Sequence, residues 1–245
     1  MRSGHLYKNN KLIALIPARG GSKGLTRKNV RLLMGRPLIE WTVEAAKKSK
    51  YLDKIIVSTE DAEIADIARR CGAEVPFLRP ARLAGDHSLV TDVALHVIDS
   101  LKRENGEDWR YMVLLQPTSP LRISGDIDSA IREFFSRRNT DAIVGVTEVS
   151  ENPFWMQTID GRGLLKSLLP PCKTMGRRQD LPKVYMVNGA IYVCKTNVLR
   201  KEGTFCPKKS GAYIMPKNRS VDIDDEEGFA LVEKVMRKSI SNGHR

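Results

Sequence analysis

The sequence predicts an α/β protein with a mostly parallel sheet between two layers of helices, three layers in all. Continuous apolar runs, typical of strands buried on both faces, recur along the chain. Amphipathic segments with helical spacing alternate with these runs. The length of 245 residues, with 41% hydrophobic and 29% charged residues, suits a single globular domain and leaves no room for a second catalytic domain.

The first strand is expected at 12–17, where the run LIALIP is closed by a proline. The elements that follow alternate, which favours right-handed crossovers between parallel strands. The other expected strands are 54–59, 111–115, 142–146 and 188–194, with shorter candidates at 73–77 and 212–215. The expected helices are 38–46, 61–71, 90–102, 126–137 and 228–238.

The alternation breaks down between residues 151 and 183, where glycines, prolines and basic residues dominate. This composition predicts an excursion away from the main sheet. We therefore expect one domain over 11–245, with 150–185 as an inserted excursion and 1–10 as an N-terminal tail.

The charge balance is strongly basic: 41 Lys and Arg residues against 29 Asp and Glu residues give a formal net charge of +12. Three partners or causes fit this charge: a nucleic acid, a small polyanionic substrate such as a nucleoside triphosphate or a sugar acid, or a lysine-rich solvated surface. The basic residues are spread along the chain without a consecutive block or an alternating aromatic stripe, which disfavours nucleic acid.

The sequence also argues against membrane-spanning, secreted, zinc-binding and disulfide-rich proteins. No run of 18 apolar residues predicts a membrane span, and the polar start lacks the apolar core of a secretory signal. The four cysteines have no CxxC spacing, so neither a zinc site nor a disulfide framework is expected. We expect a cytoplasmic protein with reduced thiols and no membrane partner.

In a parallel sheet, ligands bind at the carboxyl ends of the strands, which directs attention to the loop after residue 17. This loop reads ARGGSKG and continues to Arg27, Lys28 and Asn29. Glycines let backbone N–H groups approach an anion, and Arg19 and Lys23 supply positive charge for phosphate oxygens. The loop matches neither GxxxxGK[ST] nor GxGxxG, which disfavours a P-loop ATPase and a dinucleotide fold. The alternative is a tight turn with solvated basic residues.

Two further segments follow expected strands or precede a helix. The run QPTSPLR at 116–122 contains two prolines that stiffen it, so Gln116, Thr118, Ser119 and Arg122 would be held for recognition; alternatively it only ends a strand.

Asp222 and Asp224 point to one side of an extended stretch and could share Mg²⁺. The alternative is that the acidic run 224–227 caps the final helix.

The remaining candidate site residues give weaker indications of function. Arg178 and Gln179 could grip a carboxylate and an amide ahead of the NGAIY strand at 188–192, or they form a basic surface loop. His96 falls beside core positions of a helix and is expected to be structural. No Ser/His/Asp or Cys/His arrangement is evident from the spacing.

Together these segments resemble the acylneuraminate cytidylyltransferases, also called CMP-sialic acid synthetases. The run IPARGGSKGL with Lys28 and Asn29 is similar to that family's signature IPARxGSKGxxxKN, and 115–122 matches LQPTSPLR without a gap. The pairs Arg178-Gln179 and Asp222-Asp224 and the NGAIY run stand in the expected order, over roughly residues 11 to 240.

The resemblance implies a Rossmann-like nucleotidyltransferase sheet, with the excursion as a dimerisation subdomain of a homodimer. It also implies transfer of CMP from CTP to the anomeric hydroxyl of a nine-carbon sugar acid, with Mg²⁺ as cofactor. The implied catalytic residues are Arg19, Lys23 and Asp224. The implied nucleotide-binding residues are Arg19, Gly20, Gly21, Ser22, Lys23, Asn29, Arg79, Ala84, Gly85 and Asp86. The implied acceptor-binding residues are Gln116, Thr118, Ser119, Arg178, Gln179, Asn188, Tyr192 and Phe205. The implied metal ligands are Asp222 and Asp224.

Two departures from the family pattern touch the acceptor pocket: 204–207 reads TFCP where an aromatic pair is often found, and Met186 replaces a basic residue. The acceptor is therefore left open between N-acetylneuraminate, legionaminate and pseudaminate. The alternatives are the eight-carbon acid 3-deoxy-manno-octulosonate, a sugar phosphate, or a nucleotide-binding regulator without turnover.

Overall fold

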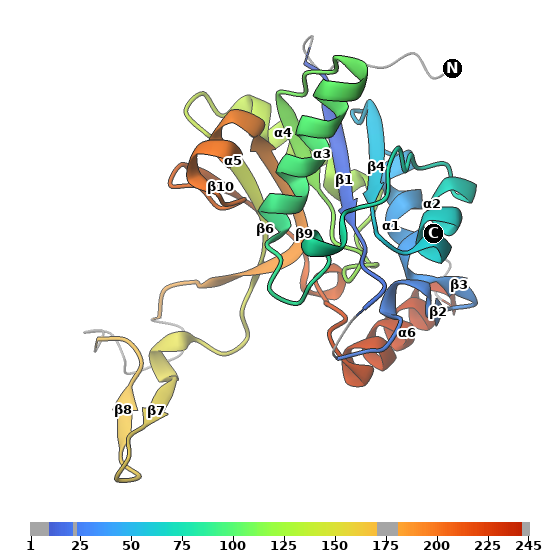
Figure 1. The fold of residues 1–245 in the computed structure, drawn as a ribbon. Coiled ribbons are helices and arrows are strands. Elements are labelled where there is room, and N and C mark those ends of the chain that lie inside the picture. The colour runs from blue at the N-terminus through green and yellow to red at the C-terminus, as the bar shows by residue number, and fades with distance from the viewer. Residues whose placement is uncertain (1–9, 22–23, 171–180, 242–245) are drawn as a thin grey trace.

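Six strands form the central sheet, in the order β10-β6-β9-β5-β1-β4 (Figure 1). The fold comes from a computed structural model, which describes residues 10–21, 24–170 and 181–241. All neighbouring strands are parallel except β9, which runs antiparallel to both β5 and β6. The strands are β1 (Leu12–Pro17), β4 (Lys54–Ser58), β5 (Tyr111–Leu114), β6 (Ala142–Glu148), β9 (Tyr185–Lys195) and β10 (Ser210–Ile214).

Helices cover both faces of this sheet, which confirms the predicted three-layer class. Along β1, Leu12, Ala14 and Ile16 belong to the apolar core on one face, whereas Ile13 and Leu15 belong to the core on the other. The first core is completed by α1 (Leu38–Lys47), α2 (Ala62–Arg70) and α4 (Ser124–Ser136). The second is completed by α3 (Val90–Asn105) and α5 (Thr196–Glu202). Each fully buried Leu or Ile contributes about 1.5–3 kcal/mol, so the continuous apolar runs fix the centre of the fold.

A third, smaller apolar cluster lies under the N-terminal part of the last helix, α6 (Glu226–Ser241). Phe229 and Val232 of α6 pack with Leu25 and Leu33. This cluster attaches the C-terminal segment to the chain that follows β1. The attachment is important for the site, because it brings two distant parts of the sequence together.

Several elements differ from the sequence prediction. Residues 73–77 do not form a strand: a single parallel bridge joins Ile56 to Glu74. The short hairpin β2 (Leu32–Leu33) and β3 (Arg36–Pro37) was not predicted, because two-residue strands are too short to show alternation. The seven residues of α5 bury one apolar side chain, Leu199, so they give no helical period.

The chain leaves the main sheet after β6 and returns with β9. An antiparallel hairpin of β7 (Gln157–Ile159) and β8 (Leu165–Ser167) extends far from the body of the molecule (Figure 1). We call residues 153–169 the arm. Residues 1–9 of the predicted tail and residues 171–180 of the excursion lie outside the described ranges.

The loop after β5 is held from inside the protein by Arg122, which is only 2% exposed. Its guanidinium donates to the carbonyl oxygens of Ala190 (2.7 Å) and Gln116 (3.2 Å) and to the Thr42 hydroxyl (2.8 Å). Burial lowers the pKa of Arg122 to about 10, against the opposing effect of nearby carboxylates. Arg122 therefore supports the loop, which corrects the expectation that it takes part in recognition at the surface.

Replacing Arg122 with Met should lower the free energy of unfolding by about 3 kcal/mol, because two buried carbonyls lose their charged donor. Urea denaturation followed by circular dichroism measures this. The matched control is Arg103→Met, which changes an exposed arginine of α3 and should leave the midpoint nearly unchanged. Equal midpoints for the two variants would contradict the supporting role.

Candidate functional site

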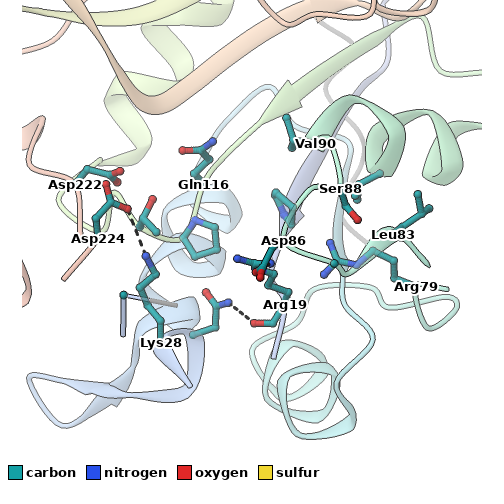
Figure 2. Close-up of a pocket in the computed structure, with 17 residues that line it drawn as sticks. Arg19, Lys28, Arg79, Leu83, Asp86, Ser88, Val90, Gln116, Asp222 and Asp224 are labelled. Atoms are coloured by element: carbon teal, nitrogen blue, oxygen red, sulfur yellow. Dashed lines mark hydrogen bonds and ion pairs between the residues drawn. The ribbon is translucent and has the colours of Figure 1, made fainter. Parts of the chain in front are cut away.

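A cleft of about 570 Å³ opens where β1 and β5 end (Figure 2). Pro17 closes β1, and Gln116 follows β5 by two residues. Nine of the predicted site residues line this cleft, which is the position that a parallel sheet gives to a ligand. They are Arg19, Asn29, Arg79, Gly85, Asp86, Gln116, Thr118, Asp222 and Asp224.

One wall of the cleft carries the first basic side chain of the glycine-rich loop. Arg19 forms an ion pair with Asp86, at 2.8 Å between Nη1 and Oδ1. The side-chain amide of Asn29, which is buried, donates to the Arg19 carbonyl at 2.9 Å. Asn29 thus fixes the backbone of the loop at Arg19, while Asp86 orients the guanidinium.

The opposite wall carries the two carboxylates (Figure 2). Asp222 accepts a hydrogen bond from the Ser119 hydroxyl at 3.1 Å, and the intervening Ile223 amide donates to the Thr118 carbonyl at 2.9 Å. Burial raises the pKa of Asp222, and the charge of Asp224 also raises it, against hydrogen bonds from the Thr118 and Ser119 side chains that lower it. The loop after β5 therefore fixes the position of the segment that carries Asp222 and Asp224.

Lys28 connects the two walls. Its Nζ donates to the Ile223 carbonyl at 2.6 Å and lies 3.5 Å from Oδ1 of Asp224. Gly24 packs even more closely: a Cβ there would lie 2.3 Å from the Asp224 carbonyl oxygen. The glycine-rich loop and the acidic segment are thus on the same cleft, as the sequence analysis required. Lys28 was noted in the basic cluster but not placed in the site; its position beside Asn29 in the family signature was the available signal.

Glu60 was missed altogether. It follows β4 and accepts from the Gly20 amide (2.7 Å) and from Nη2 of Arg79 (2.6 Å). Glu60 lies two residues beyond the end of β4, where a parallel sheet places ligand-binding loops, but its residue type alone did not reveal its partners.

Some predicted residues lie beneath the cleft and do not line it. Ser119 is fully buried, and Phe205 packs against Tyr192 with 5.9 Å between ring centroids. Burial raises the pKa of Tyr192 to about 12. Asn188 is also buried; its side chain donates to the Ser220 hydroxyl at 3.0 Å and accepts from the Ala190 amide at 3.1 Å.

Three of the predicted nucleotide-binding residues also do not line the cleft. The backbone amide of Gly20 donates a hydrogen bond to Glu60, and Ala84 follows the short 3₁₀ turn η2 (Ala81–Leu83) as its C-cap. Neither residue lines the cleft, and nor does Gly21. The predicted Ser22, Lys23, Arg178 and Gln179 lie outside the described residues.

The acidic pair has the chemistry of a magnesium site. Within the described ranges, no cluster of three or more His, Cys, Asp or Glu side chains gathers as a metal cage. Mg²⁺ commonly uses only one or two carboxylates together with waters and substrate phosphates. Mutual repulsion within the pair adds to the raised pKa of Asp222, and a cation would relieve it. Asp222 and Asp224 therefore fit Mg²⁺.

Comparison with known proteins identifies the family. A model of the cytidylyltransferase family matches residues 13–160. The chain belongs to the cytidylyltransferase family. This cytidylyltransferase is 36% identical to CMP-N,N'-diacetyllegionaminic acid synthase of Legionella pneumophila, covering 92% of this chain and 96% of that one. It is 35% identical to N-acylneuraminate cytidylyltransferase of Streptococcus agalactiae over 91% of this chain, but spans only 52% of that longer protein.

Solved structures agree with this fold. CMP:2-keto-3-deoxy-manno-octonic acid synthetase, in complex with CTP, superposes with a TM-score of 0.67 at 15% identity, covering 94% of this chain and 100% of that one. At this identity the likeness shows the fold of the cytidylyltransferase and no more. In the described part of the chain, no helix combines the length and apolar character needed to span a bilayer.

The close approach of Gly24 to Asp224 gives a test of the apposed walls. Gly24→Ala should lower the free energy of unfolding by about 1–3 kcal/mol, because the added methyl group collides with the backbone carbonyl of Asp224. Thermal unfolding measures this.

The control for this substitution is Gly125→Ala in the first turn of α4, where the nearest side-chain atom would be 3.7 Å away. Alanine is also the better helix former, so this control should be neutral or slightly stabilising. If Gly24→Ala were equally neutral, the two segments would not be in contact.

Proposed function

We propose that this cytidylyltransferase transfers CMP from CTP to the anomeric hydroxyl of a nine-carbon, sialic-type sugar acid and releases pyrophosphate. The observation that carries the proposal is the cleft itself, in which Arg19 and Lys28 of the glycine-rich loop face Asp222 and Asp224. The names of the relatives support it: they include synthases of activated legionaminic acid and cytidylyltransferases of N-acylneuraminate and pseudaminic acid.

In the proposed reaction, the anomeric hydroxyl of the acceptor gives up its proton to solvent and its oxygen forms a bond to the α-phosphorus of CTP. The bond from that phosphorus to the bridging oxygen breaks, and pyrophosphate takes the electron pair. Negative charge grows on the bridging oxygen, so fixed cations near it favour the transition state. Arg19 and Lys28 supply such charge in the described cleft, and the sequence adds Ser22 and Lys23 as further phosphate-binding groups.

The acidic wall completes the arrangement. Asp222 and Asp224 would hold Mg²⁺, which supplies positive charge against the triphosphate. Lys28 bonds to the Ile223 carbonyl between these two residues, so it fixes the distance between the carboxylates and the loop. Positioning of this kind is expected to supply much of the acceleration.

The acceptor is proposed to enter beside Gln116 and Thr118, which line the cleft after β5. Arg178 and Gln179 are proposed to complete its binding from the excursion. The names of the relatives refer to different sugar acids, so the acceptor within this class is a question for assay. We propose a cytoplasmic location, which is consistent with the cytidylyltransferase family.

A pyrophosphate-release assay tests the function. Purified protein is incubated with CTP, UTP, ATP or GTP and with N-acetylneuraminate, legionaminate, pseudaminate, 3-deoxy-manno-octulosonate or a sugar phosphate. The expected result is release with CTP and one nine-carbon acid. Release only with the eight-carbon acid or a sugar phosphate would move the enzyme to another substrate class, and no release with any pair would favour a binding protein.

We also propose that the enzyme is a homodimer formed through the arm. The arm exposes apolar side chains that a monomer would leave in water, including Ile159 at 71% and Leu165 at 69% exposure. The arm extends away from the body of the molecule (Figure 1), and both of its strands are exposed in the described part of the chain. Exposed apolar surface of this kind marks association sites.

Asp224→Ala should abolish the stimulation of turnover by Mg²⁺, because one of the two proposed ligands is lost. The measurement is initial rate against MgCl₂ concentration at saturating CTP and acceptor. Glu227→Ala is the control, since it removes a nearby exposed acid at the start of α6. A wild-type magnesium titration in Asp224→Ala would refute the assignment.

The double variant Ile159→Glu and Leu165→Glu should convert the dimer to a monomer, because four buried charges would face one another in the assembled pair. Size-exclusion chromatography with light scattering measures the mass. Leu231→Glu, at an exposed apolar position of α6, is the matched control and should stay dimeric. A monomeric wild type, or a dimeric double variant, would rule out the arm as the interface.

A further inference from the structure

Glu60 joins the glycine-rich loop to the segment that carries Arg79, without lining the cleft itself. The residue lies between the end of β4 and the start of α2. Its Oε1 accepts from the backbone amide of Gly20 at 2.7 Å, and its Oε2 accepts from Nη2 of Arg79 at 2.6 Å. These partners are 40 residues before it and 19 residues after it. A single carboxylate therefore fixes the glycine-rich loop relative to the segment that carries Arg79.

Arg79 depends on this carboxylate for its orientation. Its side chain is only 4% exposed although it lines the cleft, and Glu60 is its ion-pair partner. The backbone amide of Arg79 donates to the Thr59 carbonyl at 2.8 Å, so main chain and side chain are both tied to the end of β4. Its Nε is buried without a hydrogen-bond partner among the described residues. The guanidinium thus binds Glu60 through Nη2, and its Nε–H is still available as a hydrogen-bond donor.

The glycine-rich loop is attached to the same place. A Cβ at position 20 would lie 2.5 Å from Oδ2 and 3.2 Å from Cβ of Asp61, so a larger residue there would displace the Asp61 side chain. Asp61 also accepts from Nη1 of Arg27 at 2.5 Å and caps α2 through the Ile64 amide at 3.0 Å. Gly20 near the beginning of the loop and Arg27 near its end are both anchored at the start of α2.

We propose that Glu60 is a positioning residue for nucleotide binding: it aligns the glycine-rich loop with Arg79 so that both can meet CTP together. Glu60 acts through Gly20 and Arg79 and does not touch the substrate. A cleft whose donors are oriented in advance avoids the cost of ordering them when the ligand binds. This inference rests on the proposed function, because it takes CTP as the ligand of the cleft.

The test is Glu60→Gln, which keeps the shape but replaces one acceptor oxygen with an amide donor. Either Gly20 or Arg79 must then lose its partner, and Arg79 loses its counter-charge. The dissociation constant for CTP, measured by isothermal titration calorimetry without acceptor, should rise by at least about tenfold. The KM for the acceptor should stay at the wild-type value. Glu74→Gln, at an exposed glutamate on the far side of β4, is the matched control for CTP affinity.

A double-mutant cycle separates positioning from a general loss of structure. Arg79→Gln should weaken CTP binding, and Glu60→Gln added to it should cost much less than it costs in the wild type, because the shared ion pair is already gone. Strict additivity would overturn the proposal. If Glu60→Gln lowers the thermal midpoint, Glu60→Asp, which keeps the charge, is used; it should bind CTP with an affinity between those of wild type and Glu60→Gln.

The outcomes distinguish this inference from the function on which it rests. A wild-type chain that binds no CTP would overturn the proposed function and this role together. A wild-type chain that binds CTP, with Glu60→Gln of equal affinity, would overturn the positioning role alone.

Discussion

The site depends on the contact between the glycine-rich loop after β1 and the acidic segment before α6. These segments lie 195 residues apart in sequence at the Lys28–Ile223 hydrogen bond, yet Gly24 leaves no room for a methyl group between them. The cluster around Phe229 holds the same two regions together by apolar burial. The contact places a basic loop and two carboxylates on one cleft, which is the requirement for binding a triphosphate with a divalent cation.

A second constraint is that the cations which the structure describes on the cleft each lie beside a carboxylate. Asp86 holds Arg19, Glu60 holds Arg79, and Asp224 lies near Lys28. The carboxylates thus offset part of the positive charge that these side chains bring to the cleft. The sheet supplies the scaffold, because the ends of β1, β4 and β5 bring their loops to one edge. The site therefore combines a rigid apolar base with a charge-balanced rim.

The sequence predicted the sheet because its strands are buried on both faces and read as continuous apolar runs. It could not predict the strand order, since the position of β9 between β5 and β6 is set by tertiary packing. In the site, glycines, a signature lysine and an acidic pair were visible as motifs. Glu60 and the supporting role of Arg122 were not, because a glutamate or arginine is identified as a support only by its partners. Similarly, Asn188 and Phe205 could be placed beneath the cleft only by the packing around them.

The most direct test of the central claim is a crystal structure of the protein with CTP and Mg²⁺. The account predicts a triphosphate lying between residues 19–29 and the Asp222–Asp224 pair, with density for a cation at the two carboxylates. A nucleotide bound elsewhere, such as the smaller cavity beside His96 and Arg103, with the cleft unchanged, would contradict the account.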